Sequence, residues 1–202
     1  MSAKVELDPY TAKAQNDNLS PHEKIEGLHA IVKAVKTGMM TTRSADGSMH
    51  SRAMAPSGPH EHNQVNLFFI ANNASHKFDE IQNDDHVNVS FYDEKTTNWA
   101  SYSGVARVSQ DKDLIEKHWS SLTSAWFGDL GDNVHKGDRH DPRVSIIEII
   151  PSEIRYWVAT RNAVGRAVEI TWGAATGKSA APGELRTISS DEIQLIQGLH
   201  KK

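Results

Sequence analysis

The sequence predicts an α+β fold built on a small antiparallel β-barrel, and three observations lead to this prediction. Short apolar or alternating segments follow one another between residues 39 and 159. Turn residues separate them, and Asp46-Gly47 is a strong antiparallel hairpin signal. Helical spacing is confined to segments before, between and after the strands. About six antiparallel strands with inserted helices are typical of a barrel with its helices at the periphery.

The composition is that of one globular domain. Of the 202 residues, 38% are hydrophobic and 24% charged, which is enough for a sizeable core. A net charge of −4 gives no general attraction to nucleic acid or to an anionic membrane. The absence of cysteine excludes disulfides, thiolate metal sites and cysteine nucleophiles. No apolar run approaches the roughly 20 residues of a membrane span, and the N-terminus lacks a signal-peptide core. We expect a soluble cytoplasmic protein that binds neither nucleic acid nor membrane.

The N-terminal part of the chain divides into an arm and a helix. Residues 1–19 are polar without sustained periodicity, which predicts an extended or mobile arm. Ser20, Pro21 and Glu23 then form the pattern of a capping box with proline in the first turn. A helix that ends near Gly38 is predicted by five apolar residues at helical spacing: Ile25, Leu28, Ile31, Val32 and Val35.

The strands are predicted mainly from period-two alternation and apolar runs. A bulge is expected at Gly104, inside the longest of the first five. The predicted strands are 39–43, 50–55, 65–71, 86–92, 98–108, 144–150 and 153–159, the last two separated by Pro151-Ser152.

The remaining segments alternate between helix and loop. Helices are predicted at 76–82 and 111–127, and residues 128–142 form a loop rich in glycine, aspartate and histidine. Beyond Thr160 we expect a strand at 167–172, a Gly/Ala/Pro-rich stretch at 173–183 and a short helix at 190–198. The predicted organisation is an arm at 1–19, a barrel domain at 20–159, and an extension at 160–202 that packs on the barrel or trails from it.

Ser75-His76-Lys77 follows an apolar strand at the predicted start of a helix. Free N–H groups at a helix start, together with a hydroxyl and an ammonium group, suit a phosphate. The alternative is an ordinary serine cap followed by two exposed basic residues. Arg52 lies in the middle of a strand, where it needs an anionic partner if its side chain points into the barrel mouth. Its alternative is a strand with one solvated face.

Two further groups of residues have a simpler explanation. The tryptophans and tyrosines, Trp126 among them, could stack on a planar ligand but are more often core residues. Histidines lie in the loops His60-Glu61-His62 and Asp138 to Asp141, without a spacing that aims two ligands at one point. We therefore predict no metal site.

The order of these segments resembles the flavin-binding split-barrel family. More narrowly, it is similar to the general stress protein branch of the pyridoxamine 5′-phosphate oxidase-like proteins, and to the fungal blue-light-inducible proteins within it. The resemblance covers about residues 20–158. The residues that carry it are Thr41-Thr42, His50 to Met54, Leu67-Phe68-Phe69, Ser75-His76-Lys77, Val87 to Ser90, Ser101 to Gly104 and Ala125-Trp126-Phe127.

The resemblance implies a six-stranded antiparallel Greek-key split β-barrel with peripheral helices. It also implies a homodimer that binds FMN at the subunit interface. Arg52, Ser75 and Lys77 then contact the FMN phosphate, with His76 beside them. The backbone of Phe69, Ile70, Ala71 and Asn72 runs along the isoalloxazine edge, and Trp126 approaches the flavin from the partner subunit.

The activity is left open between three possibilities. The first is a flavin-dependent oxidoreductase or flavin carrier, with no catalytic residue assigned. The second is a pyridoxine or pyridoxamine 5′-phosphate oxidase. This chain lacks the Arg-x-x-x-Arg-Leu-x-Pro type segment that such oxidases use for the vitamin phosphate, and only Arg139 and Arg143 could replace it. The third is a haem-binding split barrel.

Overall fold

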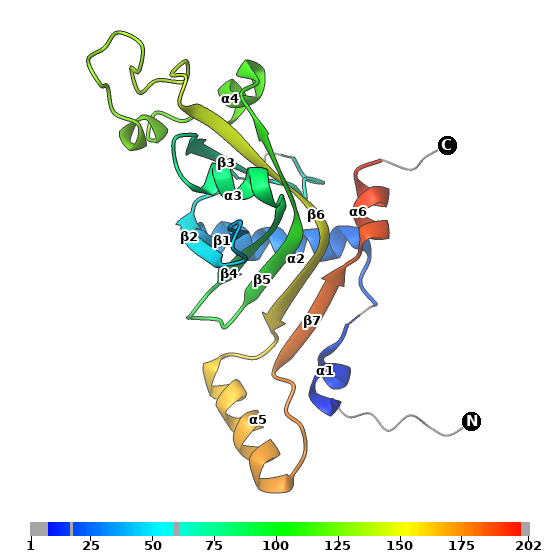
Figure 1. Ribbon diagram of the computed structural model, residues 1–202. Coiled ribbons are helices and arrows are strands. Elements are labelled where there is room, and N and C mark those ends of the chain that lie inside the picture. Colours follow the sequence, from blue (N-terminus) through cyan, green and yellow to red (C-terminus); the bar gives the residue numbers. More distant parts are fainter. Residues whose placement is uncertain (1–7, 17, 59–60, 199–202) are drawn as a thin grey trace.

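A curled antiparallel sheet forms the centre of the molecule in a computed structural model that describes residues 8–16, 18–58 and 61–198 (Figure 1). The strands are β1 (Gly38–Arg43), β2 (Met49–Met54), β3 (Leu67–Asn72), β4 (His86–Tyr92), β5 (Trp99–Ser109), β6 (Val144–Ala159) and β7 (Gly183–Ile188). The helices are α1 (Pro9–Ala14), α2 (Pro21–Val35), α3 (Lys77–Asn83), α4 (Lys112–His118), α5 (Ala163–Thr176) and α6 (Ser190–Ile196), with a 3₁₀ helix at Thr123–Trp126.

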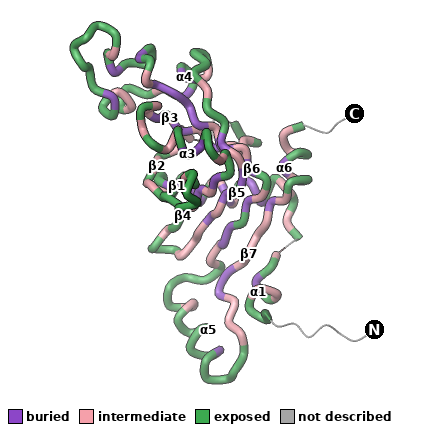
Figure 2. Tube along the Cα trace, in the orientation of Figure 1, coloured by how far each residue is buried: buried purple, intermediate pink, exposed green. Residues whose placement is uncertain are grey.

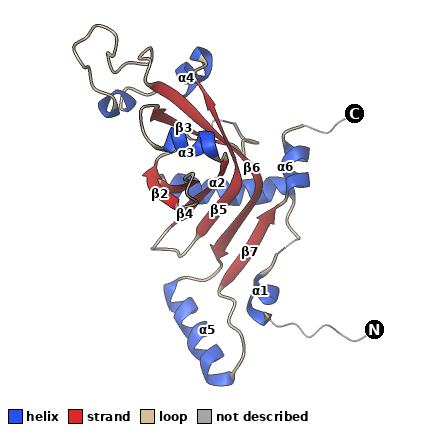
Figure 3. Cartoon of the chain, in the orientation of Figure 1, coloured by secondary structure: helices blue, strands red, loops and turns tan. Residues whose placement is uncertain are grey.

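The sheet confirms the predicted fold. Six strands follow the order β2-β1-β4-β5-β6-β3, all neighbours antiparallel, with the helices at the periphery (Figure 3). The seventh strand, β7, was not predicted. It pairs with residues 154–159 of β6, on the edge that β3 occupies at residues 144–149. The split barrel therefore carries one additional strand from the C-terminal extension.

Helix α2 packs into the core as its sequence predicts. Ser20 and Glu23 form the capping box, with the Ser20 N–H donating to Glu23 Oε2 over 2.8 Å. The residues of its apolar face, Ile25, Leu28, Ile31 and Val32, are all buried and belong to the core cluster of the barrel. In Figure 2, buried stretches lie along the strands of the sheet. Burial of each such side chain contributes about 1.5–3 kcal/mol.

The strand β6 is continuous, so the prediction of two strands divided at Pro151-Ser152 is wrong. Ser103 pairs with Glu153 and Gly104 pairs with Pro151, so that Ser152 is an extra residue in the β5–β6 ladder. Proline is tolerated in a sheet at such a bulge because the ladder needs no N–H there. Gly104 has no side chain for a physical reason: a Cβ atom at this position would lie 2.2 Å from the Ile150 carbonyl oxygen.

The predicted helix 111–127 is shorter than its apolar pattern suggests. The α-helix ends at His118, and a separate 3₁₀ helix follows after a turn. Serine and threonine side chains bond locally in this turn: Ser120 Oγ lies 2.9 Å from Thr123 Oγ1, and Ser124 donates to the Ser121 carbonyl over 2.7 Å. Such bonds compete with continued helix.

The predicted strand 167–172 is also wrong, because these residues lie inside α5. Asn162 caps the helix through its side chain, which accepts from the Gly165 N–H over 2.9 Å, and Gly177 ends it with φ +69°. The alternating valine and isoleucine residues have no neighbouring strand to pair with there. The caps and alanines therefore decide the local structure.

The described part of the N-terminal arm is packed against the sheet. Residues 9–14 form α1, where Tyr10 stacks on Trp157 at 5.8 Å and Asn16 donates its N–H to the Leu185 carbonyl over 3.0 Å. An extended or mobile arm is therefore wrong for residues 8–16. Residues 1–7 and 17 of that predicted arm lie outside the described residues. The last helix of the chain, α6, is attached to α2, because Lys24 Nζ lies 2.7 Å from Glu192 Oε1.

Among the described residues, no helix combines the length and the apolar character needed to cross a membrane.

Replacing Gly104 with alanine tests the bulge. The new Cβ atom would meet backbone atoms of Ile150, which cannot move without breaking the β5–β6 ladder. We expect the free energy of unfolding, measured with urea, to fall by about 2 kcal/mol or more. The control is Ser103→Ala at the neighbouring exposed position, which should change it by less than about 0.5 kcal/mol. Equal stability of both variants would contradict the steric assignment.

Candidate functional site

The turn after β3 brings Ser75 and Lys77 together. Ser75 closes the turn by donating its N–H (3.2 Å) and its hydroxyl (2.8 Å) to the Asn72 carbonyl. Lys77 donates from Nζ to Ser75 Oγ over 2.5 Å, and Nζ lies 5.7 Å from the centre of the Phe78 ring. The hydroxyl and the ammonium group thus lie in one place, half-buried at the beginning of α3.

Arg52 joins the same cluster from β2. Its half-buried guanidinium donates to Glu80 Oε2 over 2.6 Å and to the Thr42 hydroxyl. Burial lowers the pKa of Lys77, and the charge of the nearby Arg52 lowers it further. Arg52 binds Glu80, which lies one turn after Lys77 on α3, so its charge acts on Lys77. Arg52 therefore lies in the same region of the structure as Ser75 and Lys77, which are in direct contact with each other.

His76 does not meet them. Its side chain is fully exposed, and its only described neighbour of opposite charge is Asp79, whose Oδ2 lies 3.7 Å from Nδ1. His76 precedes α3, which begins at Lys77 and has only seven residues. Asp79 and Glu80 lie in the first turn of this helix. The attraction for an anion therefore comes from the side chains of Arg52 and Lys77 and not from the helix end, which the sequence had suggested.

Glu80 is a site residue that sequence reasoning missed. This buried carboxylate accepts from Arg52, from Thr42, from His50 Nδ1 at 2.6 Å and from Ser44 Oγ at 3.4 Å. Burial raises its pKa, but the hydrogen bonds from Thr42, His50 and Arg52 outweigh burial and lower the pKa to about 2. Arg52 signals that an anionic partner exists, because a strand arginine that points inward needs one, but it does not show which carboxylate that is.

The donor set fits a phosphate monoester. Arginine has five N–H donors and lysine three. The described contacts of Arg52 use its two Nη atoms, and those of Lys77 use one donor, on Ser75 Oγ. The two cations can therefore still donate charge-assisted hydrogen bonds to a dianion, whereas the Ser75 hydroxyl proton is used on the Asn72 carbonyl.

The edge of β3 beside this cluster presents backbone groups. Phe69 and Ala71 point into the core, and β3 pairs with β6 on one side only. On the other side, the carbonyls of Phe68 and Asn72 accept from the N–H groups of Ser57 (2.8 Å) and Ser75 (3.2 Å). Because backbone groups alternate in direction along a strand, the N–H and carbonyl of Ile70 face the same edge. Within the described contacts neither has a partner across it.

Trp126 lies apart from the cluster, on the long segment between α4 and β6. This segment projects from the barrel at the end opposite α5 (Figure 1). The Trp126 side chain is 84% exposed, so the structure does not bring it to the other predicted site residues. The segment exposes three more large apolar side chains, and we call the four together the loop apolar patch: Leu122, Trp126, Leu130 and Val134.

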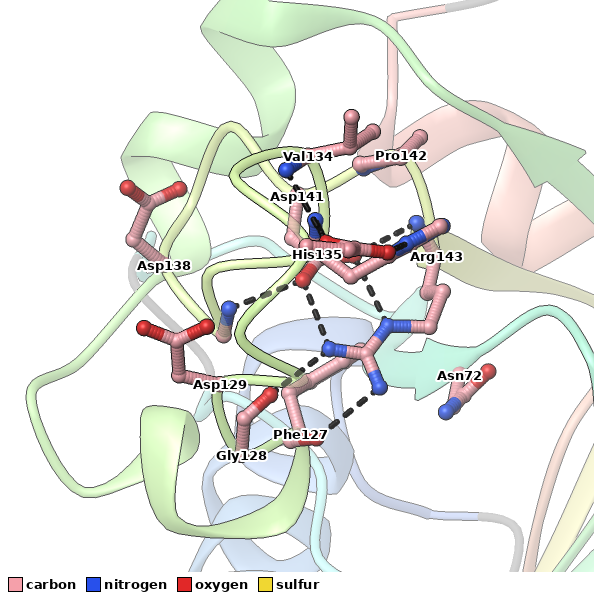
Figure 4. Close-up of polar contacts among 12 residues, drawn as sticks. Asn72, Phe127, Gly128, Asp129, Val134, His135, Asp138, Asp141, Pro142 and Arg143 are labelled. Atoms are coloured by element: carbon pink, nitrogen blue, oxygen red, sulfur yellow. Dashed lines mark hydrogen bonds and ion pairs between the residues drawn. The ribbon is translucent and has the colours of Figure 1, made fainter.

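Arg143 holds this projecting segment in place (Figure 4). Its guanidinium donates to the carbonyls of Phe127 (3.0 Å) and Gly128 (2.7 Å) and to both oxygens of Asp141 (3.0 and 2.7 Å). The Asp141 side chain is completely buried and also accepts from the Gly137 N–H over 2.8 Å. The Arg143 hydrogen bond is the main cause that lowers the pKa of Asp141.

The two loop arginines considered for a second phosphate site are both engaged. Every nitrogen of the Arg143 guanidinium donates to a described group, and Arg139 lies 3.1 Å from Glu116. The Arg143 carbonyl in turn accepts from the Asn73 N–H over 2.9 Å. The base of the loop is thus attached to the turn that carries Ser75.

Of the histidine loops, His60 lies outside the described residues. The described residues hold one group of possible metal ligands, Asp84, Asp85 and His86, mainly at the surface. His86 Nδ1 lies 2.9 Å from Asp84 Oδ1, so the group is explained by its own ion pairs.

The comparisons with known proteins agree with the observed fold. Residues 23–181 match the family described as Pyridoxamine 5′-phosphate oxidase like. The chain is 39% identical to Protein bli-3 of Neurospora crassa over 194 residues, covering 96% of this chain and 92% of that protein. A putative general stress protein 26 from Jannaschia sp. CCS1 has a similar structure, with a TM-score of 0.60 and 17% identity over 83% of this chain and 98% of the other. An FMN binding protein from Nostoc punctiforme, related to pyridoxamine 5′-phosphate oxidase, gives a TM-score of 0.53 and 15% identity over 73% and 94% of the two chains. The two structural likenesses show a shared fold.

The Asp141–Arg143 pair can be tested by Asp141→Asn. The substitution keeps the shape of the side chain but leaves the Arg143 guanidinium without its counter-charge. We expect the free energy of unfolding to fall by about 3 kcal/mol, and trypsin to cut the loop faster at Lys136 and Arg139. Glu116→Gln removes the exposed partner of Arg139 and should change stability by less than about 0.5 kcal/mol. An Asp141→Asn loop as resistant as the wild type would show that the pair does not hold it.

Proposed function

The chain belongs to the pyridoxamine 5′-phosphate oxidase-like family, and we propose that it is an FMN-binding flavoprotein of the general stress and blue-light-inducible type. It acts as a flavin-dependent oxidoreductase or as a flavin carrier. The observation that carries the proposal is the meeting of Arg52, Lys77 and Ser75 at one half-buried place. No buried counter-ion other than Glu80 is described there, so one positive charge remains for a ligand.

Each part of FMN has a matching part of the site. The phosphate binds Arg52 and Lys77 through charge-assisted hydrogen bonds, and the Ser75 hydroxyl joins them by rotating its proton away from the Asn72 carbonyl. The flavin ring lies along the open edge of β3, where the backbone of Ile70 can bond the polar edge of the ring. Phe69 and Ala71 anchor this edge in the core and so keep it rigid. Bound FMN supplies electron and hydride transfer, and the protein supplies binding and orientation.

The second part of the proposal is a homodimer with the flavin site at the subunit interface. The loop apolar patch supports it, because four large apolar side chains that are 57–84% exposed are costly to leave in water. The loop that carries them is held at its base, because Arg143 donates hydrogen bonds to the carbonyls of Phe127 and Gly128. A rigid apolar projection is suited to pack against a second copy, with Trp126 approaching the partner's flavin.

An oxidase of pyridoxine or pyridoxamine 5′-phosphate has weaker support. Such an enzyme needs a second group of cations for the substrate phosphate. Arg139 and Arg143 were the candidates, and both already bind carboxylates. For the haem alternative, three described loop histidines have polar neighbours, which does not favour an axial ligand: His135 lies 2.6 Å from Asp132, His62 lies 3.9 Å from Glu26, and His140 accepts from Arg139 over 3.4 Å.

The phosphate assignment is tested by titrating the protein with FMN and with riboflavin, which lacks the phosphate. We expect the wild type to bind FMN at least about 10-fold more tightly, since one charged hydrogen bond contributes about 1.5–3 kcal/mol. Lys77→Ala should weaken FMN binding by about 10-fold or more and leave riboflavin binding unchanged. His76→Ala is the matched control, because this side chain is fully exposed, and it should change neither affinity by more than about 2-fold. Equal affinity of the wild type for both ligands would reject the assignment.

The dimer is tested by Trp126→Asp with light scattering on a size-exclusion column. The wild type should have twice the single-chain mass of 22.4 kDa at micromolar concentration. A charge in the centre of the interface should weaken dimerisation by about 2 kcal/mol or more, which is about 30-fold, and shift the mass toward one chain. Leu195→Asp, at an exposed apolar residue of α6, should leave the dimer intact. A wild-type mass of one chain would reject the proposed dimer.

A further inference from the structure

Glu80 is the buried residue of the site that the proposed FMN contacts leave without a role. Its carboxylate lies on α3, one turn from Lys77, and only 9% of the side chain is exposed. It does not face a phosphate as a donor, because a carboxylate only accepts hydrogen bonds. A negative charge beside an anion site weakens the binding of the anion. Glu80 therefore needs a different role to explain its position.

Glu80 connects α3 to β1 and β2, because it accepts hydrogen bonds from Thr42 of β1 and from Arg52 of β2. The hairpin register places Arg52 opposite Met40 and His50 opposite Thr42, so these four side chains share one face of β1 and β2. Glu80 Oε2 accepts from Arg52 and Thr42, and Oε1 accepts from His50 and Ser44. The Thr42 hydroxyl also accepts from Arg52 Nη1, so both Nη atoms of the guanidinium are held by neighbouring groups.

These contacts fix a side chain that would otherwise be mobile. Arg52 lies on β2, an edge strand that pairs with β1 alone among the described strands. A free arginine loses up to about 2 kcal/mol of rotamer entropy when it is fixed. If Arg52 is already fixed before a ligand binds, the binding free energy does not include this entropy cost, and the ligand binds more tightly. The described contacts leave Arg52 Nε unused, on the same guanidinium.

We propose that Glu80 is the positioning residue of the phosphate site: it holds Arg52 on the inner face of the β1–β2 hairpin, beside Lys77 and Ser75, before FMN binds. The inference rests on the proposed FMN function. The role belongs to the shape and hydrogen bonding of Glu80, because its charge partly cancels that of Arg52. The low pKa of Glu80 agrees with this, since the ionised carboxylate offers both oxygens as acceptors to Arg52, Thr42 and His50.

The experiment compares two substitutions of Glu80 that separate shape from charge. A glutamine keeps an oxygen for Arg52 and Thr42 and can donate its amide to His50 or Ser44, but it removes the negative charge. We expect Glu80→Gln to bind FMN as tightly as the wild type or up to a few-fold more tightly. Glu80→Ala should bind FMN about 10-fold more weakly. Both should bind riboflavin like the wild type, which a general loss of structure would not allow.

A second pair of variants covers the case in which Glu80→Ala does not fold. Thr42→Val removes the hydroxyl that links Arg52 to Glu80 in a side chain of similar shape, and Thr42→Ser keeps the hydroxyl. We expect Thr42→Val to weaken FMN binding by about 3-fold or more, with Thr42→Ser close to the wild type and riboflavin binding unchanged in both.

The outcomes separate this inference from the proposed function. If the wild type binds FMN and riboflavin equally, the phosphate site itself is refuted, and the role of Glu80 with it. If the wild type prefers FMN and folded Glu80→Ala and Thr42→Val keep the full preference, only the positioning role is refuted. A Glu80→Gln protein as weak as Glu80→Ala would also refute it, because the charge and not the geometry would then matter.

Discussion

The pairing of β6 with three other strands is the constraint on which the rest of the structure depends. One edge of this 16-residue strand binds β5, and the other edge binds β3 at residues 144–149 and β7 at residues 154–159. The long ladder with β5 is possible only because Ser152 is bulged and Gly104 leaves room for the Ile150 carbonyl. The first part of β6 thus supports the edge where the flavin is proposed to lie. Its second part attaches the C-terminal extension.

Two buried carboxylates, Asp141 and Glu80, determine which hydrogen bonds Arg143 and Arg52 can still make. Asp141 and the carbonyls of Phe127 and Gly128 occupy every nitrogen of Arg143, so this residue is structural. Glu80 holds Arg52 at Nη2 and Thr42 holds it at Nη1, and the guanidinium remains partly exposed. Because a buried charge must be paired, each arginine has a partner. Arg143 therefore holds the loop, whereas the described contacts of Arg52 leave its Nε free to donate to an anion.

These two pairs are also connected through the backbone. The Asn73 N–H binds the Arg143 carbonyl, and Asn72 begins the turn that positions Ser75. The loop that carries the apolar patch and Ser75 of the proposed phosphate site are therefore attached to the same short segment after β3. A dimer that buries the loop would act on the end of the strand along which the flavin is proposed to bind.

Local sequence determined the elements whose signals are local: the capping box of α2, the Asp46-Gly47 hairpin, and the positions of β1 to β5, within about two residues at each end. It also singled out Arg52, Ser75 and Lys77 as candidates, each with an ordinary alternative, and only the family resemblance favoured the phosphate role. It could not identify Glu80, since 28 residues separate this carboxylate from Arg52 and only the packing of α3 on β1 brings them together. The same holds for β6, β7 and α5, where Pro151 and the alternating Val168 and Ile170 carry misleading local signals. Whether a segment pairs as a strand, and whether an arginine is free, depends on neighbours distant in the chain, and only the tertiary structure supplies them.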